Sequence, residues 1–437
     1  MFERIPLSEL TIKITDGSHF SPTPVEHGML IANVKDMQGG SVDLGSCTRI
    51  SEKDYLKLAA SGCIAKRNDV LLSKDGTVGK VAVMDGEEKL ATLSSIAIIS
   101  IAEKADHRYV GQFLKSGDAK RQYDNAMSGS ALRRLVLRDV KSLKIPTPPR
   151  GEQELIARIL DTLDTQIQKT EALIAKLEKV KEGMLHDLLT RGIDKNGQLR
   201  PSPEQAPELY KESPLGLIPR EWNVACLGDL LASVSPAMRS GPFGSALLKD
   251  ELVERGAPLL GIDNVKVEEF SANFSRFVTP EKFAELSRYA VRPNDIMITI
   301  MGTVGRCCLV PDGIGDALSS KHTWALTLDQ EKYSPYLAML QINYMPWVLN
   351  HFSRDQQGGT MSAIRSETLA SLFLPVPPRH EQSEIEFRIL EINKRLASEI
   401  TALSKMRLEK SGLMDGLLTG RVRVTPFLEQ AQATTPA

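Results

Sequence analysis

The stretch Pro146-Thr-Pro-Pro-Arg-Gly-Glu-Gln153 recurs later in the chain as Pro375-Val-Pro-Pro-Arg-His-Glu-Gln382, with six of eight residues identical. The offset is 375 minus 146, or 229 residues, which is about half of the 437-residue chain. Self-similarity at a fixed offset indicates an internal duplication. We therefore interpret the chain as a tandem repeat.

Each copy of this motif precedes a long stretch without proline, in which mostly apolar residues recur in steps of four and three. Two separate amphipathic core helices are the simpler interpretation, but this spacing continues over more than four heptads and favours a coiled coil. Both copies have polar residues at the same two steps, Thr170 with Glu399 and Lys181 with Lys410, and buried polar positions fix register. We call the residues expected at the helix–helix and partner interface the seam. They are Leu160, Leu163, Ile167, Ile174, Leu177, Ile389, Ile392, Leu396, Leu403 and Met406.

The segments before the two helical stretches also correspond. Asp69–Lys80 matches Asp295–Arg306, and both contain a buried strand that runs into a Gly-Thr-Val-Gly turn. Further strands are predicted at Val81–Val83 and Ile96–Ile101, and one helix at Tyr109–Tyr123 with a counterpart near 336–352. Outside such matches the two globular parts differ from each other far more than the two helices do. We therefore interpret the helices as a shared frame and the globular parts as variable domains.

Composition narrows the class of protein. There are 54 Lys and Arg residues against 55 Asp and Glu, a net charge of −1 that is unusual for a nucleic-acid binder acting alone. No stretch of uninterrupted apolar residues approaches 18 in length, and the N-terminus lacks the apolar core of a signal peptide. A cytoplasmic protein without a membrane span is therefore expected. The five cysteines form no Cys-x-x-Cys pair, which argues against a disulfide framework and a zinc site.

Catalytic motifs are missing from the sequence. The two Pro-Pro pairs lack the asparagine and the aromatic residue of a DNA methyltransferase motif, and Gly76-Thr-Val-Gly79-Lys80 has the wrong spacing for a P-loop. A nuclease centre can be assembled only from Asp69 with Glu87-Glu-Lys89, and the second half has no counterpart to Glu87-Glu-Lys89. We therefore expect no catalytic residue, no metal and no cofactor in this chain.

Cations gather in particular places although the total charge is close to zero. Six lie between Ser128 and Arg150 against one acid, and the Gly-Thr-Val-Gly turns end in Lys80 and Arg306. Glycine-rich turns can offer N–H groups to phosphate, and neighbouring cations add affinity. Solvated turns and ordinary packed loops are the alternatives. The candidate DNA contacts are Lys74, Thr77, Lys80, Arg133, Arg134, Arg138, Phe243, Ser245, Thr303 and Arg306.

Taken together, these residues resemble the specificity (S) subunit of type I restriction–modification enzymes. The resemblance covers nearly the whole chain. It depends on the duplicated Pro-x-Pro-Pro-x-x-Glu-Gln motif, Leu-Leu-Thr at both helix ends (188–190 and 417–419), and the two glycine-rich turns. The phrase from Ser213 to Trp222 and the segment Gly241-Pro-Phe-Gly-Ser245 also match, although the first half has Asp16-Gly-Ser-His-Phe20 at the place of the latter.

The resemblance implies an α+β fold, with two duplicated mixed α/β target-recognition domains separated by two long helices. These helices form an antiparallel coiled coil with pseudo-two-fold symmetry. The expected division is target-recognition domain 1 (1–145), helix 1 (146–192), a Pro-rich linker (193–220), target-recognition domain 2 (221–374), helix 2 (375–424) and a flexible tail (425–437).

The resemblance also implies function. Each domain recognises one half of a bipartite double-stranded DNA target, and the helices set the spacing. The subunit is non-catalytic and assembles with two methyltransferase (M) subunits and with restriction (R) subunits, which bring S-adenosylmethionine, ATP and Mg²⁺. The competing interpretation is a scaffold of two modules, held by a coiled coil, that binds something other than DNA.

The duplication predicts that a fragment ending near Pro207 forms a homodimer, because it keeps one globular domain and one complete seam. With partner subunits the dimer should recognise a symmetric bipartite target. Light scattering measures the association directly. A fragment that stays monomeric at tens of micromolar would count against equivalent seams.

Overall fold

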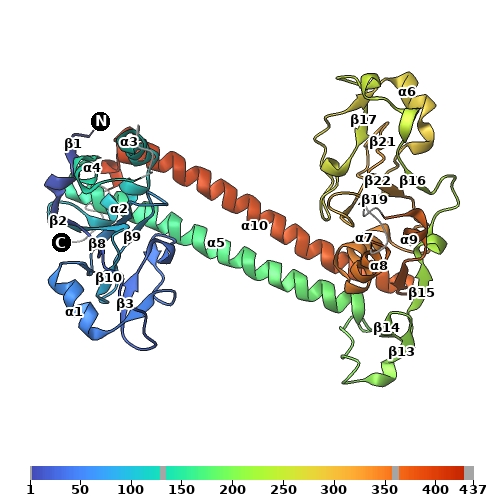
Figure 1. The fold of residues 1–437 in the computed structure, drawn as a ribbon, viewed down its shortest axis with the longest axis horizontal. Helices are drawn as coiled ribbons and strands as arrows, with labels where there is room; N and C mark the ends of the chain where they lie inside the picture. Colours follow the sequence, from blue (N-terminus) through green and yellow to red (C-terminus); the bar gives the residue numbers. More distant parts are fainter. Residues whose placement is uncertain (1, 128–133, 357–363, 428–437) are drawn as a thin grey trace. The chain divides into compact units, whose positions relative to one another are not determined.

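The computed structural model describes residues 2–127, 134–356 and 364–427 (Figure 1). Its contacts divide the chain into two compact units. Unit 1 contains Met1–Ala175 and Ser398–Ala437, and unit 2 contains Lys176–Ala397. Each unit therefore combines one globular domain with one part of each long helix. The division expected from the sequence keeps each long helix as one segment, whereas the packing units divide both helices.

The two long helices are α5 (Arg150–Thr190) and α10 (Arg379–Thr419), each of 41 residues. Both begin directly after the Pro-Pro pair of the repeated motif, since proline has no N–H to donate inside a helix and is tolerated at its start. Both end shortly before a glycine with positive φ, Gly192 (62°) or Gly420 (75°), as is common at helix C-termini.

Within each unit the two helices pair antiparallel, as predicted. In unit 1, Asp164 of α5 pairs with Lys410 of α10 while Glu171 pairs with Arg407 at 2.6 Å, so the residue numbers run in opposite directions. In unit 2, the C-terminal turns of α5 share one apolar core with Ile385 and Ile389 at the beginning of α10.

The residues of the predicted seam are all buried or half-buried. Six of its residues are buried, namely Leu160, Leu177, Ile389, Ile392, Leu396 and Leu403, and the rest of that set is half-buried, namely Leu163, Ile167, Ile174 and Met406. Leu413 departs from the pattern because it is 38% exposed, and Met414 packs inward instead. A helix of 3.6 residues per turn drifts from a 3.5-residue repeat, which explains the shift at this end.

The globular part of unit 1 is built on two four-stranded β-sheets. The first has the antiparallel order β2-β11-β8-β9 and the second the order β6-β3-β10-β7. The strands are β2 (Thr11–Asp16), β3 (Met29–Ala32), β6 (Thr48–Ile50), β7 (Ile64–Ala65), β8 (Asp69–Ser73), β9 (Val81–Val83), β10 (Leu90–Thr92) and β11 (Ile96–Ile101).

Strand β8 shows how the layers are built. Val70 and Leu72 pack in a core with the helices, whereas Leu71 packs in a second core with residues of the other sheet. Because alternate side chains of a strand point to opposite faces, β8 is covered on both sides. The covering helices are α2 (His107–Lys115), α3 (Gly117–Met127) and α4 (Leu137–Ser142), and strand β1 (Arg4–Pro6) pairs with β12 (Lys144–Pro146) beside them.

Unit 2 repeats this plan. Its main sheet has the order β16-β22-β19-β20 and its second sheet the order β18-β17-β21. The elements are β15 (Asn223–Cys226), β16 (Met238–Ser240), β17 (Ala257–Leu260), β18 (Phe277–Val278), α6 (Pro280–Glu285), β19 (Ile296–Thr299), β20 (Cys307–Leu309), β21 (Leu318–Ser319), β22 (Thr323–Leu326), α7 (Pro335–Tyr344), α8 (Pro346–Gln356), α9 (Ser366–Ala370) and β23 (Phe373–Val376).

Two sequence predictions need correction. The single helix expected at Tyr109–Tyr123 is two helices, α2 and α3, and its counterpart is likewise split into α7 and α8. The second pair breaks at Met345, since the following Pro346 cannot continue the hydrogen-bond ladder. The Pro-rich linker (193–220), expected to have little regular structure, contains a hairpin, β13 (Tyr210–Ser213) with β14 (Gly216–Pro219), and its Tyr210 and Ile218 are buried.

The last two residues of the repeated motif explain its recurrence. Gln153 accepts a hydrogen bond from the N–H of Asp106, the N-cap of α2, at 2.9 Å, and donates one to the Pro148 carbonyl at 2.8 Å. Gln382 makes the same pair of bonds in unit 2, with the N–H of Ser334 and the Pro377 carbonyl, both at 2.9 Å. The glutamine therefore fixes the start of each long helix to the globular domain beside it.

The preceding glutamate joins that start to the segment that follows the other long helix. Glu152 accepts from Arg423 (Nε–Oε2 3.0 Å), which lies just beyond α10. Glu381 accepts from Arg200 (Nη2–Oε2 3.0 Å), from the indole of Trp222 at 3.0 Å, and from the N–H of Ile193 at 2.7 Å. Both carboxylates are almost completely buried, which makes their partners obligatory.

Changing Glu381 to Gln should destabilise unit 2 by about 3 kcal/mol, because the change removes the buried negative charge that pairs with the buried Arg200. Urea unfolding followed by tryptophan fluorescence measures this. Glu384→Gln is the matched control, since Glu384 forms only a partly exposed pair with Arg388 on the same helix and its loss should cost less than about 1 kcal/mol. Equal stability of the two variants would contradict the role given to Glu381.

Candidate nucleic-acid interface

Four segments of domain 1 meet at one edge of the main sheet. They are the loop after β2, the turn after β8, the connection between β10 and β11, and the segment that begins at Arg134. The N–H of Ser94 donates to the Ser18 carbonyl at 2.8 Å, and the N–H of Leu135 donates to the Lys74 carbonyl at 2.8 Å. Segments distant in sequence therefore form one composite surface.

Lys74 holds this surface together from inside. Its side chain is 1% exposed, and its ammonium lies 3.3 Å from both Asp16 and Asp75. Asp75 also pairs with Arg134 at 3.0 Å, which links the turn to the segment behind it. Burial leaves Lys74 almost no surface for a phosphate, so the structure gives it a supporting position in place of the expected DNA contact.

Close backbone approach explains the glycine that both halves share at this edge. A Cβ on Gly17 would lie 2.3 Å from the Leu93 carbonyl oxygen, and a Cβ on Gly241 would lie 2.2 Å from the Ser319 carbonyl oxygen. Asp16-Gly-Ser-His-Phe20 and Gly241-Pro-Phe-Gly-Ser245 therefore occupy equivalent places, although only one glycine is shared. The residue directly after each glycine is buried, but the next ones differ between the halves and are exposed, among them Phe20 (55%) and Phe243 (60%).

The two Gly-Thr-Val-Gly turns are built alike. In the first, the Ser73 hydroxyl donates to the Thr77 carbonyl at 2.6 Å and accepts from the N–H of Lys80 at 2.8 Å. In the second, the Thr299 hydroxyl donates to the Thr303 carbonyl and accepts from the N–H of Arg306 at 3.1 Å. A buried hydroxyl therefore closes each turn and leaves Thr77 or Thr303 exposed at its tip.

In domain 2 the equivalent edge has a hollow of about 240 Å³. Its lining includes Lys249, Arg276, Lys321 and His322, and Arg276 forms an ion pair with Asp263. Lys249 and Lys321 are exposed. Neither lysine was singled out in the sequence, although Lys321 directly follows Leu318-Ser319-Ser320, which matches Leu93-Ser94-Ser95 of the first half.

The other predicted contacts do not all lie at these edges. The Lys80 side chain points away from the sheet edge, since its ammonium donates to the Val34 carbonyl at 3.2 Å. Arg138 is exposed on α4, where it pairs with Asp139 at 3.4 Å. Ser245 and Arg306 are exposed, and Arg133 lies outside the described residues. DNA contact by these side chains remains a prediction.

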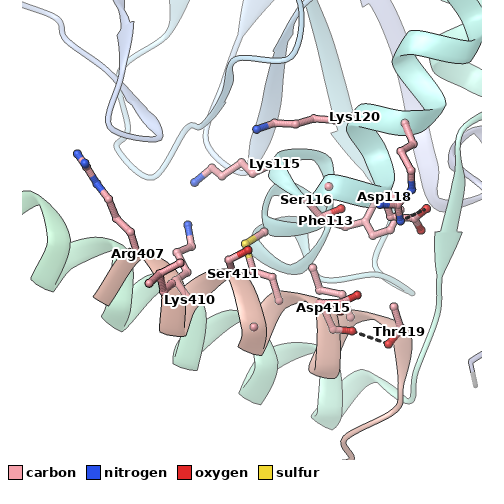
Figure 2. A pocket seen from close by; sticks show the side chains of 16 residues that line it. Phe113, Lys115, Ser116, Asp118, Lys120, Arg407, Lys410, Ser411, Asp415 and Thr419 are labelled. Atoms are coloured by element: carbon pink, nitrogen blue, oxygen red, sulfur yellow. Dashed lines mark hydrogen bonds and ion pairs between the residues drawn. The ribbon is translucent and has the colours of Figure 1, made fainter. Parts of the chain in front are cut away.

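A second feature of unit 1 is a groove of about 550 Å³ between α2–α3 and α10. Figure 2 shows Lys115 and Lys120 on one wall facing Arg407 and Lys410 on the other. The equivalent hollow of unit 2 has Glu178 where unit 1 has Arg407, and Glu182 where it has Ser411. The duplicated grooves therefore differ in charge.

The described part of the chain shows no cluster of three or more His, Cys, Asp or Glu side chains arranged for a metal ion. Among the described helices, none has the length and apolar character needed to cross a membrane.

Comparison with known proteins gives a consistent picture. Residues 33–179 match the model of the type I restriction modification DNA specificity domain. A putative type I restriction enzyme MjaX specificity subunit from Methanocaldococcus jannaschii is 26% identical over 414 residues, which cover 91% of this chain and 88% of the relative. The EcoBI specificity subunit of Escherichia coli is 23% identical over 61% of this chain and 54% of its own length.

The fold agrees with these sequence matches. The crystal structure of a type I restriction–modification S subunit from M. genitalium aligns with a TM-score of 0.58 at 15% identity, covering 96% of each chain. The same duplicated plan is therefore matched along nearly the whole length. In sequence and in fold, the chain is similar along nearly its whole length to the DNA specificity subunits of type I restriction–modification systems.

Proposed function

We propose that each globular domain recognises one half of a bipartite DNA sequence and that the chain itself catalyses no reaction. The observation that supports this is the pair of equivalent sheet edges, which share a turn closed by a hydroxyl and a glycine close to the neighbouring backbone but display different side chains. A conserved support with variable exposed residues suits two half-sites of different sequence.

The two long helices then set the distance between the half-sites and bind two methyltransferase subunits. Large apolar side chains are exposed along α10, including Phe387 (60%) and Leu408 (75%), and exposed apolar surface of this kind marks protein contacts. Restriction subunits join the same assembly. S-adenosylmethionine, ATP and Mg²⁺ belong to these partners, and a chain with a net charge of −1 relies on them for most phosphate contacts.

Binding to duplex DNA at several salt concentrations, with and without the methyltransferase partner, tests this function. Salt-sensitive binding that becomes sequence-specific with the partner supports it. If the chain does not bind duplex DNA either with or without the methyltransferase partner, the alternative of a two-module scaffold for another ligand would be favoured.

Changing Lys321 to Ala should reduce the slope of log affinity against log salt by about one unit, since each phosphate neutralised contributes about 0.9. The recognised sequence should stay the same. Lys394→Ala, an exposed lysine of the same unit on α10, is the control and should leave the slope unchanged. A changed target at constant slope would instead assign Lys321 to base recognition.

Inserting one heptad after Leu177 and one after Met406 should lengthen the preferred DNA spacer by about three base pairs. Seven residues add roughly 10 Å of helix and preserve the seam, and DNA advances about 3.4 Å per base pair. Methylation of a library with randomised spacers measures the preference. Affinity should also fall, because three base pairs rotate one half-site by roughly 100°.

Four-residue insertions at the same two places are the control, since they break the seam and should abolish binding. If the heptad variant kept the parental spacer, the helices would not set the distance and partner subunits would position the domains.

A further inference from the structure

In each unit one carboxylate joins the globular domain to both long helices. In unit 1 Asp161 of α5 also accepts from Gln112, at 2.7 Å, but the carboxylate that additionally pairs with α10 belongs to Asp164 of α5. Its Oδ2 accepts from Gln112 at 2.8 Å and lies 3.3 Å from the ammonium of Lys115, both on α2, and its Oδ1 pairs with Lys410 of α10. We call this cluster the carboxylate hub of unit 1.

The carboxylate hub of unit 2 is centred on Glu268, which lies in the globular domain. Glu268 accepts from Lys181 of α5 at 2.6 Å, from Asn393 of α10 at 3.3 Å, and from the hydroxyl of Tyr344 of α7. Burial together with the neighbouring Glu268 raises the pKa of Tyr344, so the phenol stays a donor. Lys181 and Lys410 are the matched polar positions of the two helices.

The two hubs occupy matched positions, but their carboxylates come from opposite sides. With the 229-residue offset of the repeat, Lys410 matches Lys181, Lys115 matches Tyr344, and Asp164 matches Asn393. The domain loops correspond by hairpin register instead. Gly39-Gly40 forms the turn after Met37-Gln38, and Val267-Glu268 forms the turn after Val265-Lys266, so Glu268 matches Gly40. The helix therefore supplies the acid in unit 1 and the domain loop supplies it in unit 2, while the opposite position is neutral in each.

The backbone and the space at Gly40 agree with this exchange. Gly40 has φ of 86° and Glu268 has φ of 61°, so both positions have left-handed backbone. A hollow of about 460 Å³ lies at Gly40 and is lined by Lys115, Asp164 and Gln168, among others. Unit 1 thus has room where unit 2 has the Glu268 side chain.

Mismatched combinations are electrostatically unfavourable. A domain with Glu268 placed on the helix that bears Asp164 would bring two carboxylates together in a half-buried site, where like charges disfavour each other. A domain with Gly40 placed on the helix that bears Asn393 would leave Lys115 and Lys181 side by side without an acid. Partly buried charges without counter-charges are costly.

We propose that the carboxylate hubs match each recognition domain to its own pair of helix ends. At the two exchanged positions one carboxylate is required, from the helix or from the domain, and a second one is rejected. Domain 1 and domain 2 are therefore interchangeable only if positions 164 and 393 are exchanged with them. This goes beyond DNA recognition, because it concerns which domain each end of the frame accepts.

A double-mutant cycle in the full-length chain tests the hub of unit 2 with nearly isosteric changes. Asn393→Asp adds a second carboxylate and Glu268→Gln removes the first, and each should speed hydrogen exchange of the amides in 265–270 at least tenfold. The combined variant moves the single acid to the helix and should exchange within about threefold of the parent. Additive effects of the two changes would overturn the proposal.

The reciprocal cycle in unit 1 uses Gly40→Glu, because a Cβ on Gly40 would lie 2.6 Å from the Lys115 ammonium, the far end of a flexible side chain. Gly40→Gln is the control, since it carries the same backbone strain at φ of 86° without the charge. Relative to Gly40→Gln, Gly40→Glu should speed exchange in 37–42 at least tenfold, and adding Asp164→Asn should restore it to within about threefold. Failure of Asp164→Asn to rescue Gly40→Glu would overturn the proposal for unit 1.

A full-length chimera in which 1–145 and 221–374 are exchanged tests the consequence directly. With Asp164→Asn and Asn393→Asp in the helices, the chimera should melt at a higher temperature than the same chimera with parental helices. Equal melting temperatures would mean that the hubs do not select the domains, whatever the chimera's activity on DNA.

Discussion

A buried carboxylate near the beginning of each long helix is the interaction on which the rest depends. Glu152 holds Arg423 and Glu381 holds Arg200, so each helix start is tied to the chain that has just left the other helix. The adjacent glutamine ties the same turn to the N-cap of a helix in the globular domain. Removal of either contact leaves buried polar groups without partners, which is why both copies of the motif keep both residues.

This constraint separates the parts of the chain that can change from the parts that cannot. The helix starts, the seam and the shared glycine at Gly17 and Gly241 are fixed by burial or by close backbone approach. The loops beyond each glycine are exposed and carry different side chains in the two domains. Because the support is independent of those side chains, the two domains can recognise different sequences without changing the frame.

The carboxylate hubs show that the duplication also diverged inside the frame. Burial raises the pKa of Asp164, but Lys115, Lys410 and Gln112 more than compensate, so the pKa lies below its ordinary value. In unit 2 the matched helix residue is Asn393, and Glu268 in the domain loop supplies the carboxylate instead. Equal backbone geometry with an exchanged charge distinguishes two ends that would otherwise be equivalent.

Sequence alone determined the duplication, the helix starts, the seam and the buried strands, because these follow from local periodicity and from proline chemistry at Pro148-Pro149 and Pro377-Pro378. It did not predict the break between α2 and α3, the hairpin after α5, or the burial of Lys74 between two aspartates. It also gave no sign that Glu268 and Asp164 fill the same role, since one lies on a loop and the other on a helix. Such relationships depend on residues far apart in sequence that meet only after the sheets and helices have packed, and tertiary structure therefore decided them.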